Sequence, residues 1–305
     1  MEKKEQLQTQ SIPKLIGTLS APAILSMLIN SVNMAIDKIF VARGAGILAL
    51  SGVTVSLGVY LVLQGFSLLL AAGSASAIAL GLGKDDKKGA EKIVGSSVTL
   101  SFVLSLLLTV IGLPAARPMM IMYGANAENI RYAMEYSTVL IAGAVFFLLA
   151  QTANSIIKGM GYAKRAFINV FVSIIVNTIL DAAFIFVFGW GVFGAAFSTV
   201  IGNAVSAVLA VHFLCRKSPA RLKLCNMKPE IRTAKTIISI GTPACVTQIA
   251  LSLLSLTCNH VADKVGGSAA VAAYGIVYSV IMLVYMPVLG LGQGVQPIIG
   301  YNYSS

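Results

Sequence analysis

Residues 169–202 read NVFVSIIVNTILDAAFIFVFGWGVFGAAFSTVIG, two long apolar runs joined by the short turn Gly189-Trp190-Gly191. Each run approaches the roughly 20 apolar residues that an α-helix needs to cross the hydrocarbon layer of a membrane. Asp181 is the one charged residue in the whole stretch. This pattern predicts two membrane-spanning helices, at about 165–188 and 192–214, with one carboxylate deep inside the first.

The composition of the whole chain extends this prediction. Hydrophobic residues make up 57% and charged residues 11% of 305 positions, and the mean hydropathy is +0.86. A soluble domain carries about 25% charged residues, so a chain this apolar needs lipid as its solvent. We therefore predict an all-α membrane protein with eight transmembrane helices, the remaining six lying at about 15–36, 47–80, 93–113, 136–157, 236–262 and 265–305.

The basic residues predict how the spans are oriented. If the N-terminus is cytoplasmic, seventeen of the 22 Lys and Arg residues fall on the cytoplasmic side. The five expected outside are Lys38, Arg43, Arg117, Arg131 and Lys264. Cytoplasmic loops carry an excess of Lys and Arg, so we predict a multi-pass protein of the cell inner (plasma) membrane with a cytoplasmic N-terminus. The net charge of +11 then suits anionic membrane lipids, and we expect no nucleic-acid partner.

An internal repeat appears when the sequence is shifted by 221 residues. Pro22 then falls on Pro243, Arg43 on Lys264 and Gly73 on Gly294. Because the first unit holds six predicted spans, an even number, the second unit would run parallel to it. We predict a six-helix lobe at 1–214, a basic cytoplasmic linker at 215–235, and the first two helices of an incomplete second lobe at 236–305. On this interpretation the chain is C-terminally truncated.

Four segments resemble the multidrug and toxic compound extrusion (MATE) family. They are residues 169–202, the first helix IPKLIGTLSAPAILSMLINSVNMAIDKIFVARGAG (12–46), the loop IIKGMGYAKRAF (156–167) and the ending GLGQGVQPIIGYNY (290–303). The helix-five Asn-x-x-x-Asp before a Gly-rich turn is the most specific of these elements. The resemblance implies a twelve-helix, two-lobed exporter, which we expect to be monomeric at full length, that trades H⁺ or Na⁺ for a drug-like organic cation.

Two acidic residues stand out because of their predicted depth. Asp181 lies deep in a span and Asp37 near the outer end of another. A carboxylate at the bilayer centre costs at least about 2.5 kcal/mol, so it is retained where it faces partners or a wet cavity. Asn169, Ser173, Asn177 and Asp181 recur every four residues and so form one polar stripe on a helix face, and Asn30, Asn33 and Asp37 likewise share one face of the first span. These stripes predict a reversible H⁺ or Na⁺ site.

The resemblance assigns roles to individual residues. In the family, a helix-one Asp, a helix-five Asn and Asp, and a helix-six Thr converge in the first lobe. The matching cation-coupling positions, where Na⁺ could also bind, are Asp37, Asn177, Asp181 and Thr199. Weaker candidates for the substrate cavity are Asn30, Asn33, Ser173, Gln248, Tyr274 and Tyr278. The alternatives are a solvated helix end for Asp37, interhelical hydrogen bonding for Asn177 and Thr199, and packing for the tyrosines.

The same sequence also bears on three alternatives to an exporter: an intramembrane enzyme, a lipid flippase and an inactive fragment. An intramembrane enzyme is not expected, because the chain has two His on different spans and no HExxH or GxSxG motif. We expect no cofactor besides the coupling H⁺ or Na⁺. A lipid-linked oligosaccharide flippase of a related superfamily would line its cavity with Arg or Lys, whereas every basic residue here is expected in a loop or near a span end. A third alternative is an inactive fragment in which two helices dangle.

Overall fold

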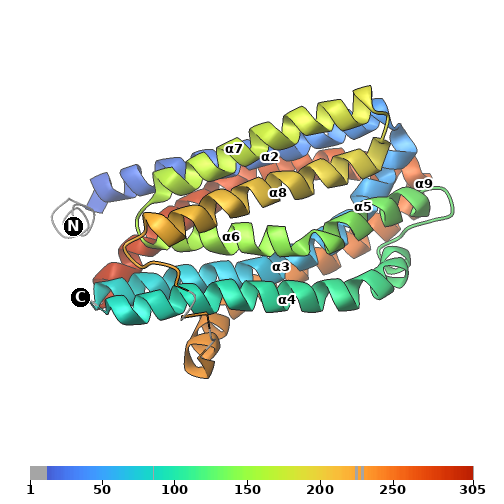
Figure 1. The fold of residues 1–305 in the computed structure, drawn as a ribbon. Helices are drawn as coiled ribbons and strands as arrows, with labels where there is room; N and C mark the ends of the chain where they lie inside the picture. Colours follow the sequence, from blue (N-terminus) through green and yellow to red (C-terminus); the bar gives the residue numbers. More distant parts are fainter. Residues whose placement is uncertain (1–11, 85, 224–225, 228–229, 305) are drawn as a thin grey trace.

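The computed structural model of the protein describes residues 12–84, 86–223, 226–227 and 230–304. Figure 1 shows that the helices form one elongated bundle with roughly aligned axes. In chain order the elements are α2 (Ile12–Gly44), α3 (Ile47–Gly83), α4 (Lys87–Met122), α5 (Ile130–Ala142), α6 (Ala144–Gly159), α7 (Ala163–Ala182), the π-helix η1 (Ala183–Val187), α8 (Gly191–Arg216) and α9 (Ile231–Ser304). This is the all-α membrane fold that the sequence predicts.

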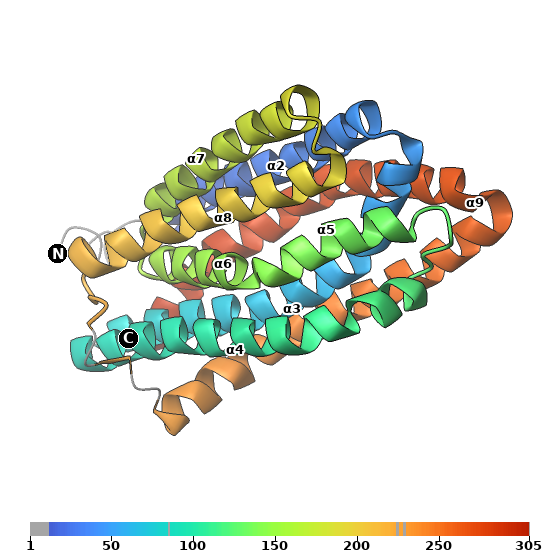
Figure 2. The ribbon, with the colours of Figure 1, turned by 45° about the vertical axis from the view of Figure 1, so that its right-hand side comes forward.

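The longest helix contains two of the predicted spans. A straight helix of 74 residues would be about 110 Å long, more than three times the roughly 30 Å hydrocarbon layer. The helical geometry of α9 breaks at Gly266 and Gly267, where Gly267 has φ 60° and ψ −155°. That conformation is essentially restricted to glycine. Figure 2 shows α9 turning back on itself at one end of the bundle, so its two halves correspond to predicted spans seven and eight.

Two other spans depart from straight helices. The predicted fourth span is a pair of helices, α5 and α6, bent by 54° at Gly143, whose α-carbon lies against the side chain of Val200 on α8. Five residues of π-helix follow α7, and then the predicted Gly-Trp-Gly turn, with φ 68° at Gly189 and 52° at Gly191. Counting the bent pair once and α9 twice gives eight crossings for the described residues.

The first helix is longer than expected. Charge-free residues end at Ile36, but α2 continues to Gly44. Asp37 therefore lies seven residues before the end of the helix, about 10 Å inside it, and not at a solvated terminus. Lys38 is only 7% exposed, so the expectation that every basic residue lies in a loop or near a span end is wrong at this position. The continuing helix carries both charges into the bundle.

Helix α3 forms the centre of the bundle. In the most apolar 18-residue segment of α3, 61% of the residues are buried, compared with 17% in that of α4. α4 instead exposes Phe102, Leu106 and Val110 on the outside of the bundle, as expected for a lipid-facing helix. α3 shares its most extensive interface with α9, and α2 also packs along α9. The α3–α9 approach is close because Gly73 faces the Ile237 carbonyl and Gly241 faces that of Leu69. The two halves of α9 are therefore packed helices, which argues against the dangling-helix alternative.

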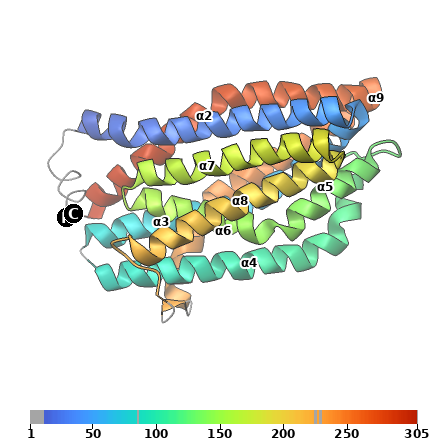
Figure 3. The ribbon, with the colours of Figure 1, turned by 45° about the horizontal axis from the view of Figure 1, so that its top comes forward.

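The connections between helices at one end of the bundle are more basic than those at the other end. The α3–α4, α6–α7 and α8–α9 connections lie at the same end as the start of α2 and the end of α9 (Figures 1 and 3). These are the connections that hold most of the Lys and Arg residues. Here the linker residue Lys223 forms an ion pair with Glu91 of α4 (2.8 Å), and the Met227 carbonyl accepts a hydrogen bond from Thr99 (2.6 Å).

Side-chain hydrogen bonds join the α4–α5 connection to the break in α9 at the opposite end. The Asn126 amide donates to Asp263 (2.9 Å) and to the Ser268 hydroxyl (3.0 Å). Ser268 in turn donates to Glu128 (3.0 Å). We call these four residues the far-end clasp. It links the first six spans to the pair formed by α9.

Candidate functional site

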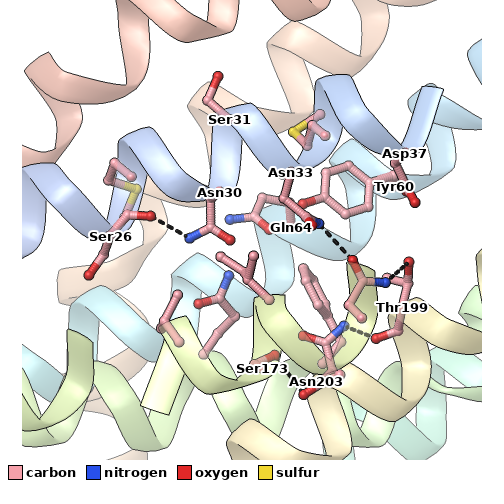
Figure 4. A pocket seen from close by; sticks show the side chains of 18 of the residues that line it. Ser26, Asn30, Ser31, Asn33, Asp37, Tyr60, Gln64, Ser173, Thr199 and Asn203 are labelled. Atoms are coloured by element: carbon pink, nitrogen blue, oxygen red, sulfur yellow. Dashed lines mark hydrogen bonds between the residues drawn. The ribbon is translucent and has the colours of Figure 1, made fainter. Parts of the chain in front are cut away.

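A cavity of about 200 Å³ lies between α2, α3, α6, α7 and α8, and α5 and α9 contribute one lining residue each, Tyr136 and Met286. Its wall is mixed, with Met, Val and Phe side chains beside amides, hydroxyls and charged groups. Figure 4 shows Asn30 and Asn33 pointing from α2 toward the side chains of α7 and α8, with Asp37 and Tyr60 farther along the same side. Pockets for drug-sized molecules usually have volumes of about 300–1,000 Å³, so this cavity would have to widen to hold such a molecule.

Amide side chains connect α2 to α7 across the cavity. The Asn33 amide donates to Asn177 Oδ1 (2.8 Å), and the Thr178 hydroxyl donates to Asn33 Oδ1 (3.0 Å). Asn177 is only 4% exposed, so these bonds replace those that water would otherwise make. Each bond fixes the rotation of α2 relative to α7 at this depth.

The same asparagine reaches α8. Its amide donates to Ser198 Oγ (3.3 Å) and Thr199 Oγ1 (3.4 Å). The Ser198 hydroxyl hydrogen-bonds to the Asp181 carboxylate. Because Asp181 is 1% exposed and Ser198 is fully buried, this contact is shielded from water. Asn177 therefore connects three helices around one buried acid.

The two membrane-embedded acids meet at this point. The carboxyl groups of Asp37 on α2 and Asp181 on α7 lie close enough to interact directly. A proton on one of them would relieve their repulsion, because a protonated carboxyl can donate a hydrogen bond whereas an ionised carboxylate has only acceptors. Oδ1 of Asp37 is buried and has no hydrogen-bond partner among the described residues. The pair can therefore hold a proton, and it has a free oxygen that could face a bound cation.

A second polar cluster lies nearer the basic end of the bundle. The Asn169 amide donates to Asn154 Oδ1 (3.0 Å), and the Asn154 amide donates to Ser206 Oγ (2.9 Å). The Ser173 hydroxyl donates to the Gly202 carbonyl (2.6 Å). These bonds join α6, α7 and α8, and they account for the inward-facing stripe that the spacing on α7 predicts.

The structure divides the sequence-predicted residues into two groups. Asp37, Asn177 and Thr199 line the cavity, and so do Asn30, Asn33 and Ser173; Asp181 lies behind them, against Asp37 and Ser198. Gln248, Tyr274 and Tyr278 of α9 are not part of the wall, to which α9 contributes Met286. The β-carbon of Gln248 lies near Gly65 of α3, and the rings of Tyr274 and Tyr278 pack on each other (6.3 Å).

Several lining residues are additional to the sequence prediction, although the sequence carries a signal for them. Gln151, Asn154 and Lys158 line the cavity and are spaced at three and four residues, which places them on one helix face. Tyr60 and Gln64 also line it and lie one turn apart in an otherwise apolar span. Ser198 directly precedes Thr199, but a lone serine beside a stronger candidate carries little signal.

Comparison with known proteins assigns the family. A family model described as MatE matches residues 22–183 and 243–305, and the two matches begin at Pro22 and Pro243, the residues that the internal repeat superimposes. The chain belongs to the MatE family. Together the two matches cover more than half of the chain and include α7, both halves of α9 and most of α2.

Relatives within the MatE family are exporters by name. The multidrug export protein MepA of Staphylococcus haemolyticus is 26% identical over 99% of this chain and 68% of its own length. The probable multidrug resistance protein YoeA of Bacillus subtilis is 27% identical over 95% of the chain and 65% of its own. The solved structure of the MATE multidrug transporter DinF-BH is 32% identical over 97% of this chain and 67% of its own, with a TM-score of 0.92. The chain spans about two thirds of the length of these relatives.

Proposed function

We propose that the protein is a secondary active antiporter that exports drug-like organic cations in exchange for H⁺ or Na⁺. It would act as a monomeric transporter, not as an enzyme, in the cell inner membrane with a cytoplasmic N-terminus. The single observation that carries this proposal is the pair of carboxyl groups formed by Asp37 of α2 and Asp181 of α7. The names of the MatE relatives support the choice of cargo.

Electrostatics explains why such a pair binds and releases a cation. Two unit negative charges about 4 Å apart repel by about 4 kcal/mol at an effective dielectric constant near 20. One proton or one monovalent metal ion relieves that repulsion. An organic cation entering the cavity competes for the same negative charge. Loading one cation therefore favours release of the other, which is the requirement for exchange.

The chemistry of the donor set fits Na⁺ as well as H⁺. Asp37 offers its unpartnered Oδ1, and Thr199 and Asn177 supply hydroxyl and amide oxygens nearby. Hard cations prefer such oxygen ligands. The Asn177 oxygen already accepts a bond from Asn33, so it would have to be shared. A proton needs only the two carboxyls.

The cavity wall suits an organic cation for a second reason. The aromatic rings of Tyr60, Tyr136 and Phe147 line it beside Asp37, and ring faces attract cations at close range. Apolar side chains such as Met27, Met34 and Ile174 line other parts of the wall and can adapt to different shapes. A mixed wall of this kind favours amphiphilic cargo.

The proposal is tested with the protein reconstituted in lipid vesicles. A cationic dye is loaded, a proton or sodium gradient is imposed, and dye movement is followed by fluorescence. Asp37→Asn and Asp181→Asn should each lower gradient-driven transport at least about tenfold, equivalent to about 1.4 kcal/mol. Glu230→Gln, at an exposed residue of the basic end, is the matched control and should transport as wild type. Undiminished transport by Asp181→Asn would overturn the proposal.

A second candidate cargo rests on two lysines. Lys38 and Lys158 both line the cavity, and cationic walls suit the phosphate of a lipid-linked sugar. The same vesicles loaded with a fluorescent lipid-linked phosphate distinguish the two candidates. Transport of that lipid without transport of the dye would favour a flippase.

A further inference from the structure

Lys38 is a buried cation to which the proposed exchange of an organic cation for H⁺ or Na⁺ assigns no role. It follows Asp37 in α2 and is 7% exposed. Removing an ammonium group from water is costly, so it is retained where partners offset that cost. The identity of its partners therefore indicates what the lysine does.

Two of these partners belong to α9. The Lys38 ammonium donates to the carbonyl of Gly275 (2.5 Å) and lies 5.5 Å from the centre of the Tyr278 ring. Gly275 has no side chain, and its α-carbon packs directly on Thr54 of α3, which holds that carbonyl in place. The lysine thus connects α2 to the eighth span, in the part of the chain that the second MatE match covers.

Its remaining electrostatic partner is the carboxyl pair. Asp37 precedes Lys38 on α2, and Asp181 contacts Asp37 from α7. The other titratable groups that interact with the pair are the phenols of Tyr60 on α3 and Tyr136 on α5, whereas the Tyr278 ring of α9 lies against the Lys38 ammonium. The only acid in α9 is Asp263, which lies in the far-end clasp. Lys38 is therefore attracted by carboxylates on one side and by a neutral carbonyl and ring on the other.

We propose that Lys38 is a positioning residue that transmits the occupancy of the Asp37–Asp181 pair to α9. This rests on the proposed function, in which the pair alternately holds and releases a coupling cation. An empty pair attracts the ammonium toward α7. A pair that holds a cation attracts it less, so the contacts with Gly275 and Tyr278 dominate. The spacing of α2 and α9 then follows the occupancy of a carboxyl pair to which α9 contributes no acid.

The experiment combines transport with a distance measurement. Lys38→Met removes the charge at similar volume, Lys38→Arg keeps it, and Arg43→Met is the matched control at an exposed residue of the same helix. Tyr278→Leu provides a second route, because it removes the ring and leaves the lysine in place. Labels at Ile39→Cys and Val277→Cys, both about half exposed (51% and 54%), report the α2–α9 distance on a background without the native cysteines.

In the wild type and in Arg43→Met, adding the coupling cation should change both the label distance and the rate of dye exchange. Lys38→Met should reduce the ratio of exchange rates with and without the cation by about fivefold or more and should abolish the distance change. Lys38→Arg should restore both responses, and Tyr278→Leu should weaken both. A merely structural lysine would alter folding yield without altering these cation responses.

Two results separate the failure of this inference from the failure of the proposed function. If the wild type exchanges dye in response to the cation and folded Lys38→Met does so equally, only the role of Lys38 is overturned. If the wild type shows no cation-driven exchange, the proposed function fails. In that case the label distance still tests the lysine, since a cation-induced change that persists in Lys38→Met refutes the link to α9.

Discussion

The Asn33 side chain of α2 donates a 2.8 Å hydrogen bond to the Asn177 side chain of α7, 144 residues away in the chain. Asn177 in turn bonds to Ser198 and Thr199 of α8. One amide bridge therefore fixes three helices beside the two buried carboxyls. Because α2 also packs on α9, the bridge and α2 together connect the helices that carry the acids to α9.

Removing the Asn33–Asn177 bridge should weaken the bundle modestly. Hydrogen bonds between membrane helices contribute about 0.6 kcal/mol on average and about 1.7 kcal/mol at most. We expect a double-mutant cycle of Asn33→Ala and Asn177→Ala to give a coupling energy in that range in detergent unfolding. Asn30→Ala is the control, because the Asn30 amide bonds to Ser26 of its own helix (2.9 Å). A coupling energy of zero would show that the bridge does not stabilise the helix contact.

Ser198→Ala should make the coupling cation bind more tightly. The Ser198 hydroxyl stabilises the ionised form of Asp181, and hydrogen bonds to charged groups contribute about 1.5–3 kcal/mol. Without it, half-maximal dye exchange should occur at a cation concentration at least about tenfold lower. Ser206→Ala, on the same helix beside Asn154, should leave the concentration dependence unchanged. A shift in the opposite direction would contradict the assignment of Ser198 as a donor to the acid.

Side chains added at the α3–α9 interface should be poorly tolerated. A β-carbon at Gly73 would meet the backbone of Ile237, and one at Gly241 would meet that of Leu69, which a rotamer change cannot relieve. Overpacking of this kind typically costs about 1–3 kcal/mol, so Gly73→Ala and Gly241→Ala should lower the melting temperature in detergent. Gly292→Ala meets nothing within 4 Å and should melt as wild type. Equal melting of all three variants would argue against close packing of these helices.

Gly267→Ala should strain the turn that divides α9. A side chain in this region of backbone space costs about 1–3 kcal/mol, even though no atom lies within 4 Å of the added carbon. We expect a lower melting temperature and faster proteolysis near residue 267. Gly17→Ala, which also meets nothing within 4 Å, is the control. Wild-type stability of Gly267→Ala would mean that α9 can turn without a positive φ.

Hydrophobic length and glycine punctuation predict most of this fold. Membrane spans can be predicted because each requires a long apolar segment. The turn at Gly189–Gly191 can be predicted from its two glycines, which both adopt positive φ. The sequence does not predict the bend at Gly143, because one glycine within an apolar run can equally continue a helix. At the bend Gly143 packs against the side chain of Val200, which is distant in sequence. A charge is a poor marker for the end of α2, because Asp37 and Lys38 have partners inside the bundle.

In the candidate site, too, the sequence predicts features that depend on a single helix but not those that depend on contacts between helices. Helical spacing predicts that Asn177 and Asp181 share a face, since periodicity depends on one helix alone. It does not predict that Lys38 reaches Gly275, because that contact depends on how α2 and α9 cross. Nor does it exclude Tyr274 from the cavity, since tyrosines in membrane helices look alike in sequence whichever way they face.

The far-end clasp is also a surface to which a molecule outside the cell could bind. Glu128 is exposed and Asp263 partly so, and with the proposed orientation both lie on the extracellular side. A large, membrane-impermeant binder such as an antibody fragment could therefore engage Glu128 and Asp263 together without entering the cell. Such a binder would prevent the α4–α5 connection and the α9 turn from separating and would thereby inhibit the proposed transport. Because it would act from outside the cell, export could not remove it.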